Sequence, residues 1–227
     1  MPRTARIVIP DVACHVTQRG NNREDVFFAE DDRRVYLKFL LDYSQQFRLD
    51  VDAYCLMTNH LHLVVTPHAE GALAATIGRT NQRYAQYVNH VRGRTGHLFQ
   101  SRFFSCLLDD KHLVAAIRYV EQNPVRGGIV HRAWEYAWSS AAAHVGQQDR
   151  SGLLDLKAWR AVWPETTWRQ MLTEGLDDGP IDTLRLCTSR GRPLGGESFL
   201  GRVERQIGRR VRALPRGRPK GWRKTYK

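Results

Sequence analysis

The chain has 227 residues, enough to bury a substantial core in one domain and still carry an extension. Its 35 lysines and arginines outnumber its 23 aspartates and glutamates, which gives a formal net charge of +12. A charge of this size favours a polyanionic partner, most simply nucleic acid. No apolar run is long enough to span a membrane, and the N-terminus lacks the apolar segment of a signal peptide. We therefore expect a cytoplasmic protein that acts on DNA or RNA and has no membrane partner.

The cysteines agree with a cytoplasmic protein. They are scattered and form no Cys-x-x-Cys pair, so the spacing indicates neither a zinc ribbon nor a disulfide framework. Most lie inside apolar runs, where a free thiol behaves as a small core residue. The four are Cys14, Cys55, Cys106 and Cys187.

The apolar pattern of the first 125 residues predicts the order strand, helix, strand, strand, helix, strand, helix. Between Val35 and Phe47, apolar side chains recur at intervals of three and four, which is typical of an amphipathic helix. The last helix should end near Gln122, because Pro124 disfavours helical backbone in the residue before it. This order predicts an α+β fold, a ferredoxin-like antiparallel sheet with helices packed on it. The predicted ranges are 13–19, 31–47, a hairpin over 51–66, 71–92, 103–108 and a helix from Asp109 or Asp110.

The composition changes beyond about residue 145, where residues 146–151 read as a linker. We therefore predict a domain over residues 1–145 and a mainly helical, basic extension over residues 146–227. Its helices are expected on both sides of Pro164 and at 181–188 and 197–212. From Gly201 to the end there are eleven lysines and arginines against one acidic residue. This charge is compatible with DNA binding, with Trp222 and Tyr226 stacking on unpaired bases, or with a solvated tail that only adds charge.

Two histidines open the second strand of the predicted hairpin. Because side chains alternate along a strand, His60 and His62 share one face while Leu61 and Leu63 point to the other. Two imidazoles on one rigid strand can converge on a metal ion, although two polar residues on a solvated face are the simpler interpretation. Two ligands are too few for a closed zinc site. An open site for Mg²⁺ or Mn²⁺, completed by phosphate oxygens and water, fits better, although imidazole is not the usual ligand of these ions.

The third predicted helix carries a tyrosine that could complete such a site. Tyr119 lies nearly opposite the apolar stripe of the helix, and Asn123 follows one turn later on the same face. A tyrosine hydroxyl can attack phosphorus when it is deprotonated and the phosphate is polarised. A metal ion on His60 and His62, with Asn123 as third ligand, could polarise the phosphate. Without the histidines, an ordinary tyrosine on an exposed helix would be the simpler interpretation.

Several motifs, in this order, resemble those of the single-tyrosine HUH transposases, and within that superfamily the REP-associated tyrosine transposases of bacteria. The resemblance covers about residues 5–145 and leaves residues 146–227 outside. The motifs are HVTQRGNNR from His15, HLHLVV from His60, GHLFQSRF from Gly96, YVEQNPVRGG from Tyr119, and Trp138-Ser139-Ser140.

This resemblance implies an endonuclease and strand transferase that acts on single-stranded, hairpin-bearing DNA through a 5′-phosphotyrosine intermediate. It makes Tyr119 the nucleophile and gives His60, His62 and Asn123 as ligands of one Mg²⁺ or Mn²⁺. Insertion-sequence relatives often have glutamine as third ligand, and Gln122 is the alternative, about 100° around the helix from Asn123. The residues expected to hold the DNA are Arg19, Asn21, Arg23, Arg102, Arg126, Arg209 and Arg212.

Two other functions stay open at this point. A non-catalytic regulator that binds hairpin DNA would keep the fold and the charge but would not cleave. A replication-initiator or relaxase-type nickase would use the same chemistry, usually with another order of motifs. Neither the target sequence nor the choice between a monomer and a homodimer follows from the sequence.

Overall fold

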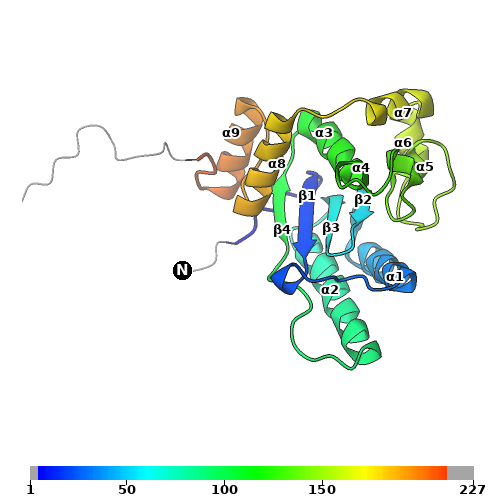
Figure 1. Cartoon of the computed structure of the whole chain (residues 1–227). Coiled ribbons are helices and arrows are strands. Elements are labelled where there is room, and N and C mark those ends of the chain that lie inside the picture. The colour runs from blue at the N-terminus through cyan, green and yellow to red at the C-terminus, as the bar shows by residue number, and fades with distance from the viewer. Residues whose placement is uncertain (1–4, 214–227) are drawn as a thin grey trace, which may run out of the picture.

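The computed structural model describes residues 5–213 and is built around a four-stranded antiparallel sheet (Figure 1). The strand order is β2-β3-β1-β4, and every neighbouring pair is antiparallel. This is the ferredoxin-like order, so the predicted α+β class and sheet are confirmed. The strands are β1 (Cys14–Arg19), β2 (Leu49–Leu56), β3 (His60–Pro67) and β4 (Phe104–Leu107).

Helices cover both faces of the sheet. The helices α1 (Glu30–Phe47) and α2 (Ala72–Val91) pack together on one face, and α3 (Asp110–Glu121) lies on the other (Figure 1). Helix α3 starts where predicted, and its N-cap is Asp109, whose side chain accepts a hydrogen bond from the backbone N–H of His112. Short turns fill the connections: η1 (Asn21–Arg23), α4 (Asn123–Arg126), η2 (Ala133–Glu135) and α5 (Ala141–His144).

The alternation of strand β3 separates two hydrophobic clusters. Leu61 and Leu63 are fully buried on the side of α1 and α2, in a cluster that includes Tyr36. Val64 faces the other way and packs in the cluster of α3, with Ile117 among its members. The two strand histidines therefore lie on the α3 side, opposite the leucines, as the sequence predicts. All four cysteines are free thiols, and three of them are buried.

Beyond residue 145 the chain is helical, as predicted, but two boundaries differ. The helix predicted at 181–188 begins earlier, at Asp178, because Pro180 fits the first turn of a helix, where its missing N–H needs no partner. The last described helix ends at Ile207 because Gly208 adopts a left-handed conformation, with φ +66°. Trp222 and Tyr226 lie outside the described residues. These helices are α6 (Leu156–Val162), α7 (Glu165–Thr173), α8 (Asp178–Arg190) and α9 (Glu197–Ile207).

The helices after residue 145 share the core of the sheet. Trp168 of α7 and Leu184 of α8 belong to the same buried cluster as α3. Phe199 and Val203 of α9 join the cluster that contains the other sheet face. In Figure 1, α8 lies beside β4, whereas α6 and α7 lie near α5 at the other end of α3. None of the helices within residues 5–213 has both the length and the hydrophobicity needed to cross a lipid bilayer.

A buried carboxylate fixes the end of α3. Glu121 has no exposed surface, and its carboxylate accepts hydrogen bonds from the Ser140 hydroxyl at 2.5 Å and from Nδ1 of His144 at 2.6 Å. The indole N–H of Trp168 donates to the second oxygen at 2.9 Å. The His144 ring stacks on Trp159, with 3.8 Å between ring centres. This network joins α3, which carries Tyr119, to α5, α6 and α7.

We predict that Glu121→Gln lowers the free energy of unfolding by about 3 kcal/mol, because an amide N–H₂ would face donors in a buried site. Urea unfolding followed by circular dichroism measures this loss. The matched change Glu70→Gln, at an exposed position, should stay within about 0.5 kcal/mol of the wild type. Equal losses in the two variants would contradict a structural role for the Glu121 network.

Candidate active site

The structure brings six of the predicted site residues to one cavity. The cavity has a volume of about 530 Å³ and lies between the sheet and the tyrosine-bearing helix. Strand and helix contribute opposite walls, so residues far apart in the sequence face the same space. The predicted residues that line it are Arg19, His60, His62, Tyr119, Asn123 and Arg126.

His60 presents its Nε2 atom without a proton. Its Nδ1 atom lies 2.6 Å from Oδ1 of Asn59, and the Asn59 amide nitrogen donates to the carbonyl of Arg23 at 3.1 Å. That second bond fixes the amide orientation, so Oδ1 must accept from Nδ1–H of His60. Because a neutral imidazole has one N–H, Nε2 keeps its lone pair.

His62 is held by a histidine from the neighbouring strand. Its Nδ1 atom lies 3.1 Å from Nε2 of His15, and the two rings are stacked with centres 5.3 Å apart. The other ring nitrogen of His15 lies 2.8 Å from the hydroxyl of Thr188 on α8. His15 is therefore buried and hydrogen-bonded at both ring nitrogens.

Tyr119 is enclosed, with only 3% of its surface exposed. Its ring makes edge contacts with His62 and His15, at 5.4 Å and 5.8 Å between ring centres. Its hydroxyl oxygen accepts a hydrogen bond from Nε of Arg185 at 3.2 Å. The interpretation of Tyr119 as an ordinary tyrosine on an exposed helix is therefore wrong, because its ring is buried against His62 and His15 and its hydroxyl contacts Arg185.

The side chains of Asn123 and Gln122 point to different places. The Asn123 amide nitrogen donates to the carbonyl of Tyr119 at 2.8 Å, and no hydrogen bond to Oδ1 is found within residues 5–213. This oxygen is therefore available at the cavity wall. The Gln122 amide nitrogen instead donates to the carbonyls of Leu172 and Glu174, at 2.8 Å and 2.9 Å, and so holds the end of α7.

Burial keeps the site histidines neutral. It lowers the pKa of His60 to about 4, with a further contribution from the positive charge of Arg19. It also lowers the pKa of His62 well below its ordinary value, and that of His15 to about 3. A neutral imidazole is the form that binds a metal ion, so no proton has to leave these rings at neutral pH.

The donor set suits an open divalent site. Two imidazole nitrogens and one amide oxygen, from His60, His62 and Asn123, line the cavity, and its remaining space can hold phosphate oxygens and water. Within the described residues, no group of three or more histidine, cysteine or acidic side chains could hold a metal ion. These residues therefore do not form a closed structural metal site. They suit a metal ion whose remaining coordination positions are filled by a substrate.

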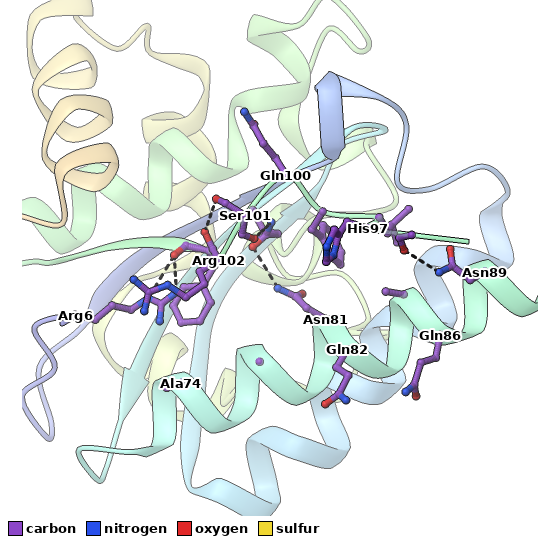
Figure 2. Close-up of a pocket in the computed structure, with 17 residues that line it drawn as sticks. Arg6, Ala74, Asn81, Gln82, Gln86, Asn89, His97, Gln100, Ser101 and Arg102 are labelled. Atoms are coloured by element: carbon purple, nitrogen blue, oxygen red, sulfur yellow. Dashed lines mark hydrogen bonds between the residues drawn. The ribbon is translucent and has the colours of Figure 1, made fainter. Parts of the chain in front are cut away.

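A second cavity, of about 840 Å³, lies between α2 and residues 96–103 (Figure 2). Amide side chains such as Gln82 and Gln86 line it from α2, and Gln100 and Arg102 line the other wall. Arg6 lies over the Phe103 ring, 3.6 Å from its centre, and no lining residue is acidic. Gln100 also lines the cavity of the histidines, so this residue borders both cavities.

The remaining predicted DNA contacts lie away from both cavities. Asn21 and Arg23 form the turn η1 after β1. Arg209 donates to the carbonyl of Ala5 at 3.0 Å. Arg212 pairs with Glu197 and Glu204, so its charge is locally compensated.

A family model described as transposase IS200-like matches residues 9–123, a range that includes both strand histidines and the tyrosine. The chain belongs to this family. It is therefore a DNA-processing enzyme of the transposase class, and the predicted resemblance is confirmed. A Haemophilus influenzae protein named as a REP-associated tyrosine transposase is 26% identical over an alignment of 145 residues that covers 52% of this chain and 82% of the relative.

A solved structure supports the same fold. A REP-associated tyrosine transposase bound to a REP hairpin matches with a TM-score of 0.56 and 17% sequence identity. The match covers 69% of this transposase and 90% of that chain. At this level of identity the likeness shows a shared fold.

Sequence reasoning missed two residues that contact the site, Arg185 and Thr188. Both lie on α8, after the end of the family match at residue 123. The helix was expected at 181–188, but no motif marks its polar side chains. Their spacing of three residues places both on one face of α8, and only the docking of α8 beside β4 shows which face that is.

We predict that the metal-free transposase loses stability as the pH falls below 6.5. His15 then becomes protonated in the unfolded chain, whereas burial lowers its pKa in the folded chain to about 3. The free energy of unfolding should fall by about 1.4 kcal/mol per pH unit for each such histidine. Urea unfolding between pH 7 and pH 5, with chelator present, measures the slope. His15→Gln should reduce it, and an unchanged slope would contradict this origin.

Proposed function

We propose that this transposase cuts and rejoins single-stranded DNA at hairpin elements, with Tyr119 as the nucleophile. The observation that carries the proposal is the single cavity lined by His60, His62, Tyr119 and Asn123. The net charge of +12 supports a DNA substrate. The relative whose structure is bound to a REP hairpin supports the hairpin as the substrate class.

The proposed metal ligands are Nε2 of His60, Nε2 of His62 and Oδ1 of Asn123. When bound, Mg²⁺ or Mn²⁺ would neutralise charge on the phosphate oxygens and make phosphorus more electrophilic. The chain itself holds the two imidazoles neutral and fixes their orientation. Gln122 is not proposed as the third ligand, because its amide group is engaged with the end of α7.

In the proposed reaction the Tyr119 oxygen attacks the scissile phosphorus. The new bond joins the tyrosine oxygen to phosphorus, and the bond from phosphorus to the 3′ oxygen breaks. The products are a 5′-phosphotyrosine link and a free 3′-OH. The tyrosine hydroxyl loses its proton when its oxygen bonds to phosphorus, and the leaving 3′ oxygen gains one proton. Attack of another 3′-OH on the link would restore Tyr119 and join the strands.

Arg185 is proposed to prepare the nucleophile. Its Nε–H bond to the Tyr119 oxygen fixes the direction of the hydroxyl, and its positive charge would stabilise negative charge that develops on that oxygen. The hydrogen bond to Tyr119 is also the main reason why the pKa of Arg185 lies above its ordinary value. The guanidinium therefore stays charged beside the tyrosine.

The two cavities are proposed as the path of the DNA strand. Arg19 and Arg126 would contact phosphates near the histidines, and Arg102 would do so in the amide-lined cavity of Figure 2. Because Gln100 lines both, a strand could pass from one to the other. Asn21, Arg23 and Arg209 are proposed as outer contacts. Arg212 is a weaker candidate because two glutamates compensate its charge.

We also propose a division of labour along the chain. Residues 1–145 carry the metal ligands and the nucleophile, and residues 146–227 form the basic extension. Within the described residues, the extension is proposed to complete the catalytic unit, because α7 and α8 share the buried cluster of α3.

We predict that Tyr119→Phe forms no denaturant-resistant adduct with a labelled hairpin oligonucleotide in Mn²⁺ or Mg²⁺, because the attacking oxygen is gone. Gel electrophoresis under denaturing conditions measures the adduct. Tyr43→Phe, a half-buried tyrosine of α1 outside the cavity, is the matched control and should react like the wild type. Adduct formation by Tyr119→Phe at the wild-type level would rule out the proposed mechanism.

The same assay separates the enzyme from a regulator that only binds. Chelator and His60→Ala should abolish the adduct, whereas hairpin binding should persist at reduced affinity. A wild-type protein that binds the hairpin, with or without chelator, and never cleaves it would support the regulator.

We predict that Arg19→Gln weakens hairpin binding severalfold and lowers the slope of log affinity against log salt by about 1, as expected for one lost phosphate contact. Fluorescence anisotropy at several salt concentrations measures both quantities. Arg34→Gln removes the same charge from α1, on the opposite face of the sheet, and should leave the slope unchanged. Equal slopes for wild type and Arg19→Gln would exclude this contact.

A further inference from the structure

We propose that Thr188 of α8 is a positioning residue for the metal site. Through His15, it selects the tautomer in which His62 presents a bare Nε2 atom to the cavity. This inference rests on the proposed metal-dependent function and deepens it. Thr188 lies outside the family match, which ends at residue 123.

A continuous buried chain of hydrogen bonds links α8 to the metal ligand. Thr188 Oγ1 lies 2.8 Å from Nδ1 of His15, and Nε2 of His15 lies 3.1 Å from Nδ1 of His62. Thr188 and His15 are each 1% exposed, and His62 is 7% exposed. Because water has little access to these atoms, their protons must be arranged among the three side chains.

The hydroxyl proton of Thr188 determines which group donates in each hydrogen bond of this series. Its hydroxyl donates to the carbonyl of Leu184 at 2.8 Å, and a carbonyl can only accept. The threonine oxygen therefore accepts from Nδ1–H of His15. A neutral imidazole has one N–H, so Nε2 of His15 accepts in turn from Nδ1–H of His62. The remaining nitrogen of His62, Nε2, is left with its lone pair.

The reverse direction would block the site. If Thr188 donated to His15, then His15 would donate to His62, and Nε2 of His62 would carry a proton. A protonated nitrogen cannot bind a metal ion. Cys106 is compatible with the first direction, because its thiol lies 3.2 Å from the Thr188 oxygen and can donate to it.

His60 reaches the same tautomer by an independent route. The Asn59 oxygen accepts from Nδ1–H of His60, which leaves Nε2 bare there as well. The two histidines of one strand thus carry their protons on the same nitrogen, although one is set by a turn residue and the other by a helix of the extension. Such outer partners orient metal ligands and typically affect metal affinity 10–100-fold.

The docking of α8 supports a role in the site rather than a passive contact. Ile181 and Leu184 are buried in the cluster of α3. Arg185, one turn before Thr188, donates to the Tyr119 oxygen. One helix therefore contacts both the proposed nucleophile and, through His15, a proposed metal ligand.

The test compares the full-length wild type with Thr188→Val, which removes the hydroxyl but keeps the shape of the side chain. Titration with Mn²⁺, followed by electron paramagnetic resonance without DNA, should show binding at least about tenfold weaker in Thr188→Val. Thr188→Ser keeps the hydroxyl and should bind like the wild type. Thr183→Val is the matched control, because Thr183 makes the same bond within α8 but is exposed.

A second measurement needs no metal and no variant. Nitrogen-15 NMR of histidine-labelled, metal-free wild type should show the proton of His62 on Nδ1. A proton on Nε2, or equal Mn²⁺ affinity of Thr188→Val and wild type, would overturn the role of Thr188. A wild type that binds no Mn²⁺ would overturn the proposed metal-dependent function, and the NMR result would still decide the tautomer.

Discussion

The burial of α3 on both sides is the constraint on which the rest of the structure depends. One side packs on the sheet, α7 contacts the helix from another side, and Arg185 of α8 reaches the tyrosine hydroxyl. A helix in this position can move very little, because protein interiors are close-packed. The Glu121 carboxylate adds a directional restraint two residues after the tyrosine, since its three donors come from two later segments, residues 140–144 and α7. The phenol is thus held against the histidines by packing at its own position and by hydrogen bonds at the end of its helix.

Much of the fold could be predicted because it depends on local patterns. Strand alternation placed His60 and His62 opposite the leucines. The end of α3 near Gln122 was also predicted, although Asn123, before Pro124, is helical as the first residue of α4. The grouping of His60, Tyr119 and Asn123 around one cavity could be expected only by combining these elements with the motifs of the family. The burial of Tyr119 could not be predicted, since it depends on a helix that begins about sixty residues later. The same holds for Thr188, whose sequence surroundings are those of any polar helix residue. Contacts between distant segments leave no periodic signal.

The sequence shows a boundary between the family domain and the extension, whereas in the structure the buried core continues across it. The composition changes near residue 145, and the family match ends earlier, at residue 123. Packing crosses both points, because Trp168 and Leu184 complete the cluster that starts at Ala53 and Val64. Removing the helices after residue 145 would expose the apolar face of α3 and leave the Glu121 carboxylate without one of its donors. The extension is therefore as much a part of the core as the helices of the first 125 residues.

The donor set of the cavity has a consequence for how metal and substrate meet. His60, His62 and Asn123 are all neutral, and Arg19 and Arg126 add positive charge to the same cavity. The protein supplies no negative charge in this cavity to balance a divalent cation bound there. A DNA phosphate would supply the missing negative charge, so each of the two would raise the affinity of the other by the same factor. Cation and strand would then bind cooperatively. The free protein would bind the metal ion more weakly than its DNA complex does, and the reactive state would be completed on the DNA.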